Sequence, residues 1–346
     1  MVQTIAQRVL NNLIKDLKDK TFKYEPKDEK EIDWSAYNLS KIHELDFFLT
    51  FVREAVDSCQ IKFSENEGPG RPASDAYDLA KVLMMKAYLQ TGERQTEGLA
   101  SLFKEKLALK NIVSASTIGR AYSREDVQEI LGKVFEMTKE PIKDKETSFS
   151  GDGTGLTLST KQNYANDRDN HDKHAGYDKM AVMISNNYHI ATGFIHAKGT
   201  AHDSPLFQPV LEQTARNFHH MDDVELDAGF ISRKNCQLIS DTGAIPYIYP
   251  KKGITINQNG TPSWKKMLIS LTENPQEWLR LYHNRSQSEC YFSSHKRRFT
   301  RPLLRKIYER KGVETFCRVI TTNITMLITA YFERRIQVKE FEYCYL

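Results

Sequence analysis

The sequence predicts an α/β protein in two parts, an all-helical N-terminal domain at residues 1–145 and an α/β domain at residues 146–346. Two observations carry this prediction. Apolar residues recur at spacings of three and four through most of residues 1–140, which is typical of amphipathic helices. After residue 147, strand-like segments alternate with helix-like ones, which indicates a sheet covered by helices. The chain has 346 residues, 40% of them apolar, and can therefore bury a sizeable core.

The N-terminal domain is expected to consist of short helices joined by turns. The expected helices are residues 1–20, 40–58 and 75–91, followed by two or three short helices within residues 94–136. Residues 64–72 contain the Gly and Pro residues that break a helix. Ser116 is a candidate N-cap. Residues 114–124 belong either to the reading helix of a helix-turn-helix or to a purely structural helical domain, and the sequence leaves both open.

The second domain combines strands and helices. Its expected strands are residues 148–159, 179–186, 188–197, 224–227 and 245–249, and its expected helices are residues 204–220, 231–241, 274–298 and 303–336. Residues 160–178 and 251–263 are polar or contain Gly and Asn, and we expect loops there. Gly243 is expected to end the second of these helices. The segment Asn274–Glu277 is a typical start for the third, with a cap, a Pro at the first position and an acidic first turn.

Composition excludes several classes of protein. No stretch of about 18 apolar, uncharged residues could cross a membrane. The N-terminus lacks the apolar core of a signal peptide. The five cysteines are scattered, without the close spacing of zinc ligands or redox thiols. We therefore expect a protein of the cytoplasm.

Positive charge is concentrated in one segment. The formal net charge of +4 does not by itself indicate a nucleic-acid partner. Residues 279–311, however, contain ten Lys or Arg against two Glu. Binding to a phosphate backbone requires such a local concentration rather than a basic whole.

The third expected helix of this domain presents an unusual face. At about 100° per residue, Tyr282, Arg285, Glu289 and Lys296 fall within an arc of about 60°, and Trp278 joins them. One side of the helix would therefore carry two aromatic rings, a carboxylate and two cations. A solvated helix face usually shows mixed charges without aromatic residues.

Two aspartates stand where expected strands meet glycine. Asp152 lies in Gly-Asp-Gly-Thr-Gly, and Asp227 is followed by Ala-Gly. Together with Glu289 they form the set of oxygen ligands that a hard divalent cation such as Mg²⁺ prefers. Two such ions would activate an attacking oxygen and stabilise a leaving one in an in-line displacement.

The order and spacing of these residues resemble those of the DDE transposases of bacterial and archaeal insertion sequences, in the subgroup with a Tyr-x2-Arg-x3-Glu-x6-Lys motif. That motif is complete here, from Tyr282 to Lys296. Asp152 matches the first aspartate of the family, and Asp227 in Asp-Ala-Gly-Phe-Ile-Ser matches the second. Residues 199–203 match its Gly-x-x-His-Asp element. The resemblance covers nearly all of the second domain.

The resemblance implies a fold and a reaction. The fold would be ribonuclease H-like, with a mixed central sheet flanked by helices. Asp152, Asp227 and Glu289 would be the catalytic residues and would bind two Mg²⁺ or Mn²⁺ ions. Water would attack a phosphodiester at each end of the element, and the freed 3′-hydroxyl would then attack target DNA.

The resemblance also implies how DNA is held. Arg285 would grip phosphate with a bidentate fork and Lys296 as a point charge, with Arg297 and Arg298 beside it. Tyr282 would hydrogen-bond phosphate or support the helix. The implied partners are the element ends and the target DNA, bound by a homodimer at the nucleoid and without a membrane.

Several roles stay open in the sequence. Asp203 could cap a helix or belong, with His202, to the active site. Trp264 and Trp278 could be core residues or could stack on a base displaced during cleavage. A DNA-binding regulator without catalysis and a metal-dependent nuclease without strand transfer are the alternative functions. The intact set of three carboxylates argues against the regulator.

Overall fold

The computed structural model of the chain describes residues 4–25, 31–61, 73–159, 161–162, 176–257 and 259–344. The expected turn at residues 64–72 and nearly all of the expected loop at residues 160–178 lie outside these ranges. By their internal contacts, the residues form two compact units. The first comprises residues 1–31, 143–155 and 179–294, and the second comprises residues 32–142, 156–178 and 295–346. This division differs from the two expected sequence domains.

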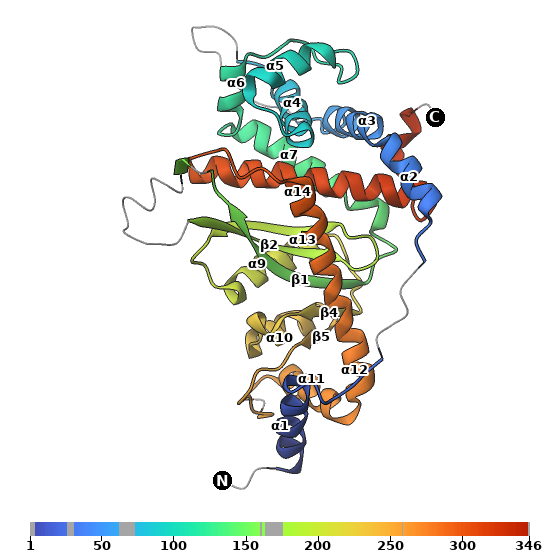
Figure 1. Ribbon diagram of the computed structural model, residues 1–346, viewed down its shortest axis with the longest axis vertical. Helices are drawn as coiled ribbons and strands as arrows, with labels where there is room; N and C mark the ends of the chain where they lie inside the picture. The colour runs from blue at the N-terminus through green and yellow to red at the C-terminus, as the bar shows by residue number, and fades with distance from the viewer. Residues whose placement is uncertain are drawn as a thin grey trace. The chain divides into compact units, whose positions relative to one another are not determined.

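The first unit is built on a five-stranded sheet with the order β3-β2-β1-β4-β5 (Figure 1). The strands are β1 Ser148–Thr157, β2 Tyr177–Ser185, β3 Ala191–Lys198, β4 Asp223–Leu226 and β5 Ile245–Ile248. β1, β4 and β5 run parallel to one another. β2 and β3 are joined by only a few residues, which allows an antiparallel pair but not a parallel crossover. The sheet is therefore mixed, and the five expected strands are confirmed.

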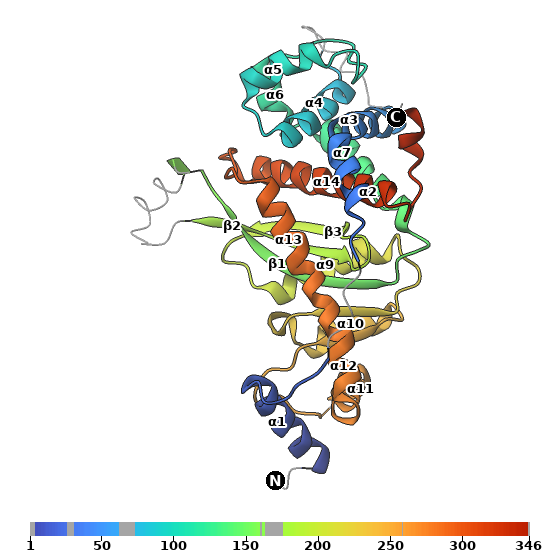
Figure 2. The same cartoon turned by 45° about the vertical axis from the view of Figure 1, so that its right-hand side comes forward.

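Helices cover this sheet (Figure 2). They are α9 Asp203–Ala215, α10 Arg233–Asp241, α11 Pro262–Glu273 and α12 Pro275–Tyr282, with α1 Ile5–Lys18 against α11. α9 packs on β3 so closely that a Cβ on Gly193 would lie 2.2 Å from the carbonyl oxygen of Val210, so only glycine fits there. Gln7 fixes α1 to this unit, because its side chain bonds the backbone of Ile254 and Ile256 at 3.0 and 2.8 Å.

The helix α11 was not expected from the sequence, although its signal was present. Trp264, Met267, Leu268 and Leu271 are buried at spacings of three and four, and Pro262 stands at the helix start. The neighbouring Gly and Asn residues concealed this start. The helix expected at residues 231–241 begins at residue 233, with Thr242 as its C-cap and Gly243 just beyond at φ +90°.

The expected single helix at residues 274–298 is interrupted. It consists of α12, a 3-10 turn η3 at His283–Arg285 and α13 at Ser286–Arg298. The predicted start is confirmed, because the Asn274 side chain accepts a hydrogen bond from the Glu277 amide at 3.3 Å. At the interruption, the Asn284 carbonyl accepts a hydrogen bond from the Ser150 hydroxyl on β1 at 3.3 Å. A tertiary contact, rather than a Gly or Pro, thus accompanies the break.

The second unit is mainly helical. It contains α2 Trp34–Ile42, α3 Glu44–Asp57, α4 Ala76–Leu89, α5 Glu93–Leu102, α6 Ala115–Ala121, α7 Glu125–Met137, η1 Glu140–Ile142, α14 Tyr308–Phe332 and η4 Lys339–Tyr343. α14 contacts α2, α3, α4 and α7 (Figure 1). Its residues 313–330 are buried on nearly every face, so this helix is less amphipathic than the sequence suggested. Being packed among several helices explains the difference.

Two further details in this unit correct the expectations. The helix expected at residues 40–58 is divided at His43 into α2 and α3. Ser116 is not an N-cap, because α6 starts two residues earlier than expected, with Ser114 in that position. Among the helices in the described part of the chain, none is both long and apolar enough to span a membrane.

Candidate functional site

The pairing of β1 with β4 brings two aspartates to the same level of the sheet. The last paired residues are Gly151 and Leu226, and each is followed directly by an aspartate, Asp152 and Asp227. Residues at equivalent positions of neighbouring parallel strands lie side by side with side chains on the same face. The two carboxylates are close enough that the charge on Asp227 helps to raise the pKa of Asp152.

The Asp152 side chain is mostly buried and 20% exposed. Its Oδ1 accepts a hydrogen bond from the Gly153 amide at 2.7 Å, and its Oδ2 accepts one from the Ser288 hydroxyl at 3.3 Å. Burial is the largest influence on Asp152 and raises the pKa, while the Gly153 amide and Arg285 lower it. The net shift is upward, so the site disfavours the bare negative charge and favours a nearby cation.

Arg285 supplies positive charge at this point. Its Nη1 lies 3.6 Å from Oδ2 of Asp152, and its Nη2 forms an ion pair with Oε1 of Glu289 one helical turn further on. The Glu289 side chain is 60% exposed. The Arg285 guanidinium therefore lies between the carboxylates of Asp152 and Glu289 and contacts both.

The same arrangement bears on metal binding. In the described residues, no three His, Cys, Asp or Glu side chains are placed around a common point that could hold an ion. Glu289 points to Arg285 instead of to the two aspartates. The donor chemistry still suits a hard cation, since Asp152 and Asp227 offer carboxylate oxygens directly after paired residues of β1 and β4.

The aromatic residues of α12 lie in the core beside this site. Trp278 is 3% exposed and stacks on Tyr282, with ring centroids 5.5 Å apart and an interplanar angle of 18°. Tyr247 on β5 contacts Trp278 from another side at 5.4 Å. Trp264 is buried as well, and its Nε1 donates to the Thr255 carbonyl at 2.7 Å. Burial favours the core interpretation of both tryptophans over stacking on a base.

His202 and Asp203 differ in their surroundings. His202 is exposed at the N-cap of α9, and its side chain makes no capping hydrogen bond. Asp203 is the first residue of α9, and its Oδ1 pairs with Nζ of Lys179 on β2 at 2.9 Å. Sequence reasoning missed Lys179, because a single lysine at the start of an apolar strand carries no distinguishing signal.

The three basic residues that follow the motif glutamate belong to the second unit. Lys296 and Arg297 are exposed on the last turn of α13. Arg298 donates to Oε1 of Glu44 at 2.6 Å, and its guanidinium lies 5.4 Å from the centre of the Tyr88 ring. Arg298 is therefore engaged within the protein, whereas the exposed Lys296 side chain faces solvent.

The basic segment at residues 279–311 is less available to a partner than its composition suggested. Several of its cations are paired with acidic residues of their own unit. These ion pairs are Arg280–Glu277, Arg298–Glu44, Arg305–Glu93 and Lys311–Asp178. The Lys311–Asp178 pair is buried on both sides, so the lysine is engaged within the fold and is not available to a ligand.

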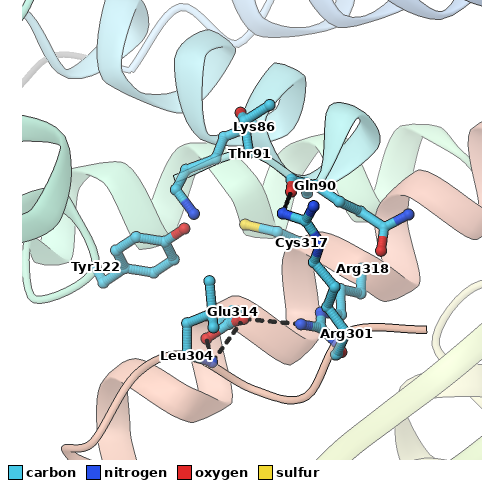
Figure 3. A pocket seen from close by; sticks show the side chains of 10 residues that line it. Lys86, Gln90, Thr91, Tyr122, Arg301, Leu304, Glu314, Cys317 and Arg318 are labelled. Atoms are coloured by element: carbon cyan, nitrogen blue, oxygen red, sulfur yellow. Dashed lines mark hydrogen bonds and ion pairs between the residues drawn. The ribbon is translucent and has the colours of Figure 1, made fainter. Parts of the chain in front are cut away.

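A small pocket in the second unit is not a substrate site (Figure 3). Glu314 accepts hydrogen bonds from the Leu304 and Arg305 amides and from the Arg318 guanidinium, at 2.9 to 3.1 Å. The enclosed space is about 20 Å³. Such a space holds about one water molecule. The pocket therefore belongs to the packing of the segment before α14.

Comparison with known proteins agrees with this arrangement. Residues 145–325 match the transposase DDE domain family. The matched segment is more than half of the chain. The chain is also 26% identical over 279 residues to the "Probable transposase for insertion sequence element ISA1214" of Archaeoglobus fulgidus. That alignment covers 79% of this chain and 81% of the relative. The matched segment contains the β1–β4 pair, both aspartates and the whole of α12 and α13. The chain therefore belongs to the transposase DDE domain family.

Proposed function

We propose that this protein cuts DNA at the ends of an insertion sequence and joins the freed ends to target DNA. The observation that carries the proposal is the register of β1 and β4, which puts Asp152 and Asp227 side by side just beyond the last paired residues. Glu289 completes the set from α13, one helical turn after Arg285. Family membership gives these carboxylates their proposed catalytic role.

The proposed site would hold two Mg²⁺ or Mn²⁺ ions with Asp152, Asp227 and Glu289. The fit rests on the chemistry of the donors, because three carboxylates provide the hard oxygens that such ions prefer. Bound ions would activate the attacking oxygen and stabilise the leaving one.

Positively charged side chains would hold the DNA backbone. Arg285 would contact phosphate once Glu289 turns towards the ions, because a guanidinium binds carboxylate and phosphate with the same fork. Lys296 and Arg297 are exposed and would add phosphate contacts. Tyr282 would support the helix through its stack on Trp278.

The finer description of the fold and the assembly belongs to the same proposal. The strand order β3-β2-β1-β4-β5, with β1, β4 and β5 parallel, supports a ribonuclease H-like domain. A homodimer would bring two element ends together with target DNA. The helical second unit would contribute to holding the element ends.

The test is incubation of the full chain with labelled element ends, target DNA and Mg²⁺. Asp152→Ala and Asp227→Asn remove a proposed metal ligand, and Asp241→Asn changes an exposed acid on α10 as a matched control. The wild type and the control should cleave and join. The two site variants should bind DNA without cleaving it.

The same assay separates the alternatives. Cleavage without joining would favour a simple metal-dependent nuclease, and binding without cleavage by the wild type would favour a non-catalytic regulator. Equal loss of cleavage and DNA binding in Asp227→Asn would contradict its role as a metal ligand, since that change preserves the shape of the side chain.

A further inference from the structure

An open hollow lies in the second unit, where α4 ends and α5 begins. Its volume is about 510 Å³, within the range of about 300–1,000 Å³ that is usual for binding sites. It is lined by the end of α4, by Gln90 and Thr91 of the turn, by Gln95, Gly98 and Leu99 of α5, and by Arg301. None of the lining residues is acidic. The hollow borders the small pocket of Figure 3 but is open to solvent, so a partner can reach it.

Arg301 brings an unpaired positive charge to this hollow. Its side chain is exposed, and Nη1 donates to the Gln90 carbonyl at 2.7 Å, which holds the guanidinium beside the turn (Figure 3). In the described part of the chain no carboxylate pairs with Arg301, whereas Arg298 and Arg305, on either side of it in the sequence, form ion pairs. The bond to the carbonyl leaves other N–H groups of the guanidinium for an acceptor on a partner.

α5 presents a small, uncharged face to the hollow. Gln95, Gly98 and Leu99 are spaced by three and four residues and therefore lie on one side of the helix. A Cβ added to Gly98 would meet nothing within 4 Å, so the protein itself leaves space at this position. Arg, Gln and Thr side chains are common donors to the phosphate oxygens of DNA. The lining of the hollow thus combines one cation with neutral donors and an open helix face.

We propose that this hollow is a second contact surface for the phosphate backbone of DNA, in which Arg301 binds a phosphate and Gly98 lets the backbone approach α5. Charge favours DNA over a protein partner, because an unpaired guanidinium among neutral groups complements a phosphate. This inference rests on the proposed function, because it assigns a further contact to the DNA that is cut.

The test measures the affinity of the full-length protein for duplex element-end DNA at several KCl concentrations, without divalent cations. Arg301→Gln removes the charge. Gly98→Lys and Gly98→Glu place opposite charges at the hollow. Gly132→Lys and Gly132→Glu are the matched controls on α7, where an added Cβ also meets nothing within 4 Å. Thermal unfolding establishes that each variant is folded.

We expect Arg301→Gln to weaken DNA binding by about tenfold and to reduce the slope of log affinity against log salt by about 1. Gly98→Lys should strengthen binding and Gly98→Glu should weaken it, because the DNA backbone is negatively charged. Both Gly132 variants should bind DNA like the wild type. An unchanged slope in Arg301→Gln, or equal responses at Gly98 and Gly132, would overturn the inference.

Sedimentation of the same variants without DNA tests for a different partner. If changes at Arg301 and Gly98 alter self-association and leave DNA affinity unchanged, the hollow binds a second copy of the chain and the inference is overturned.

Cleavage by the wild type distinguishes this inference from the proposed function. If the wild type cuts element ends and Arg301→Gln binds them with an unchanged slope, the DNA contact at the hollow is refuted and the proposed function stands. If the wild type neither binds nor cuts element ends, the proposed function is itself refuted.

Discussion

Nη1 of Arg285 lies 3.6 Å from Oδ2 of Asp152, although one residue comes from the turn before α13 and the other from β1. The same guanidinium pairs with Glu289. A side-chain cation therefore lies between two of the three carboxylates that match the family motif. An arginine in this position could also bind a phosphate group, because the guanidinium contacts phosphate with the same two N–H groups that it offers to a carboxylate.

Replacing Arg285 should separate its effect on cations from its effect on DNA. We expect Arg285→Gln to tighten Mn²⁺ binding by about two- to fivefold, the size of a partly exposed ion pair. The same change should weaken DNA binding and cleavage, because a phosphate contact is lost. Mn²⁺ titration and cleavage of labelled DNA measure the two effects.

The matched control is Arg280→Gln, which breaks an exposed ion pair with Glu277 on α12. It should leave Mn²⁺ affinity unchanged. Unaltered Mn²⁺ binding in Arg285→Gln would show that the guanidinium does not compete with the ion.

A pair of acidic residues inside β4 should make stability depend on pH. Burial is the main cause that raises the pKa of Glu225 well above its usual 4.5, and Asp223 raises it further, while Asn186 and Ser150 lower it. In the part of the chain that the structure describes, Oε1 of Glu225 and Oδ1 of Asp223 are buried without a hydrogen-bond donor. A proton held between the two carboxyl groups accounts for this arrangement.

The sign of the effect follows from proton linkage. The folded chain holds the Glu225 proton at pH values where the unfolded chain has lost it, so stability falls as pH rises above about 4.5 towards the folded pKa. Glu225→Gln should flatten this decline, because an amide keeps the shape and does not ionise. Thermal unfolding between pH 5 and 8 measures it.

Glu225→Ala is the contrasting variant. It removes the acceptor of the Asn186 amide and the Ser150 hydroxyl, and should cost about 1–3 kcal/mol. A pH profile of Glu225→Gln identical to that of the wild type would rule out the shared proton.

The two buried tryptophans of the first unit should respond differently to the same substitution. Nε1 of Trp264 donates to the Thr255 carbonyl, whereas Nε1 of Trp278 is buried without an acceptor in the residues that the structure covers. Trp264→Phe should therefore destabilise the protein by about 1 kcal/mol more than Trp278→Phe. Urea unfolding of both variants tests this, and the reverse order would disprove the hydrogen-bond argument.

Exposed and paired basic residues should contribute differently to DNA binding. We expect Lys296→Gln to reduce the slope of log affinity against log salt by about 1. Arg298→Gln should leave the slope unchanged and lower the melting temperature, because Arg298 pairs with Glu44. Affinity for element-end DNA is measured at several KCl concentrations.

The outcome that contradicts this prediction is an equal change of slope in the Lys296→Gln and Arg298→Gln variants. In that case the pairing of Arg298 within the free protein would not persist in the complex. A wild-type affinity that does not depend on salt would refute the proposed backbone contacts altogether.

The sequence alone predicted most of the secondary structure of residues 146–346 and identified the family. Strands and helices follow from the period of apolar residues, and periodicity is a local property that a single sequence contains. The spacing from Tyr282 to Lys296 identified the motif for the same reason, because its members lie within a few helical turns. In this part the sequence analysis missed α11, beside glycine and asparagine, and the break between α12 and α13.

Tertiary structure decided which side chains meet. The register of β1 and β4 sets Asp152 level with Asp227, and packing against β1 accompanies the turn that aims Arg285 at Asp152. The ion pairs Lys179–Asp203 and Arg298–Glu44 likewise join residues that are far apart in the sequence. Ion pairs and strand register depend on distances between distant segments, and a linear pattern of residue types contains no information about those distances.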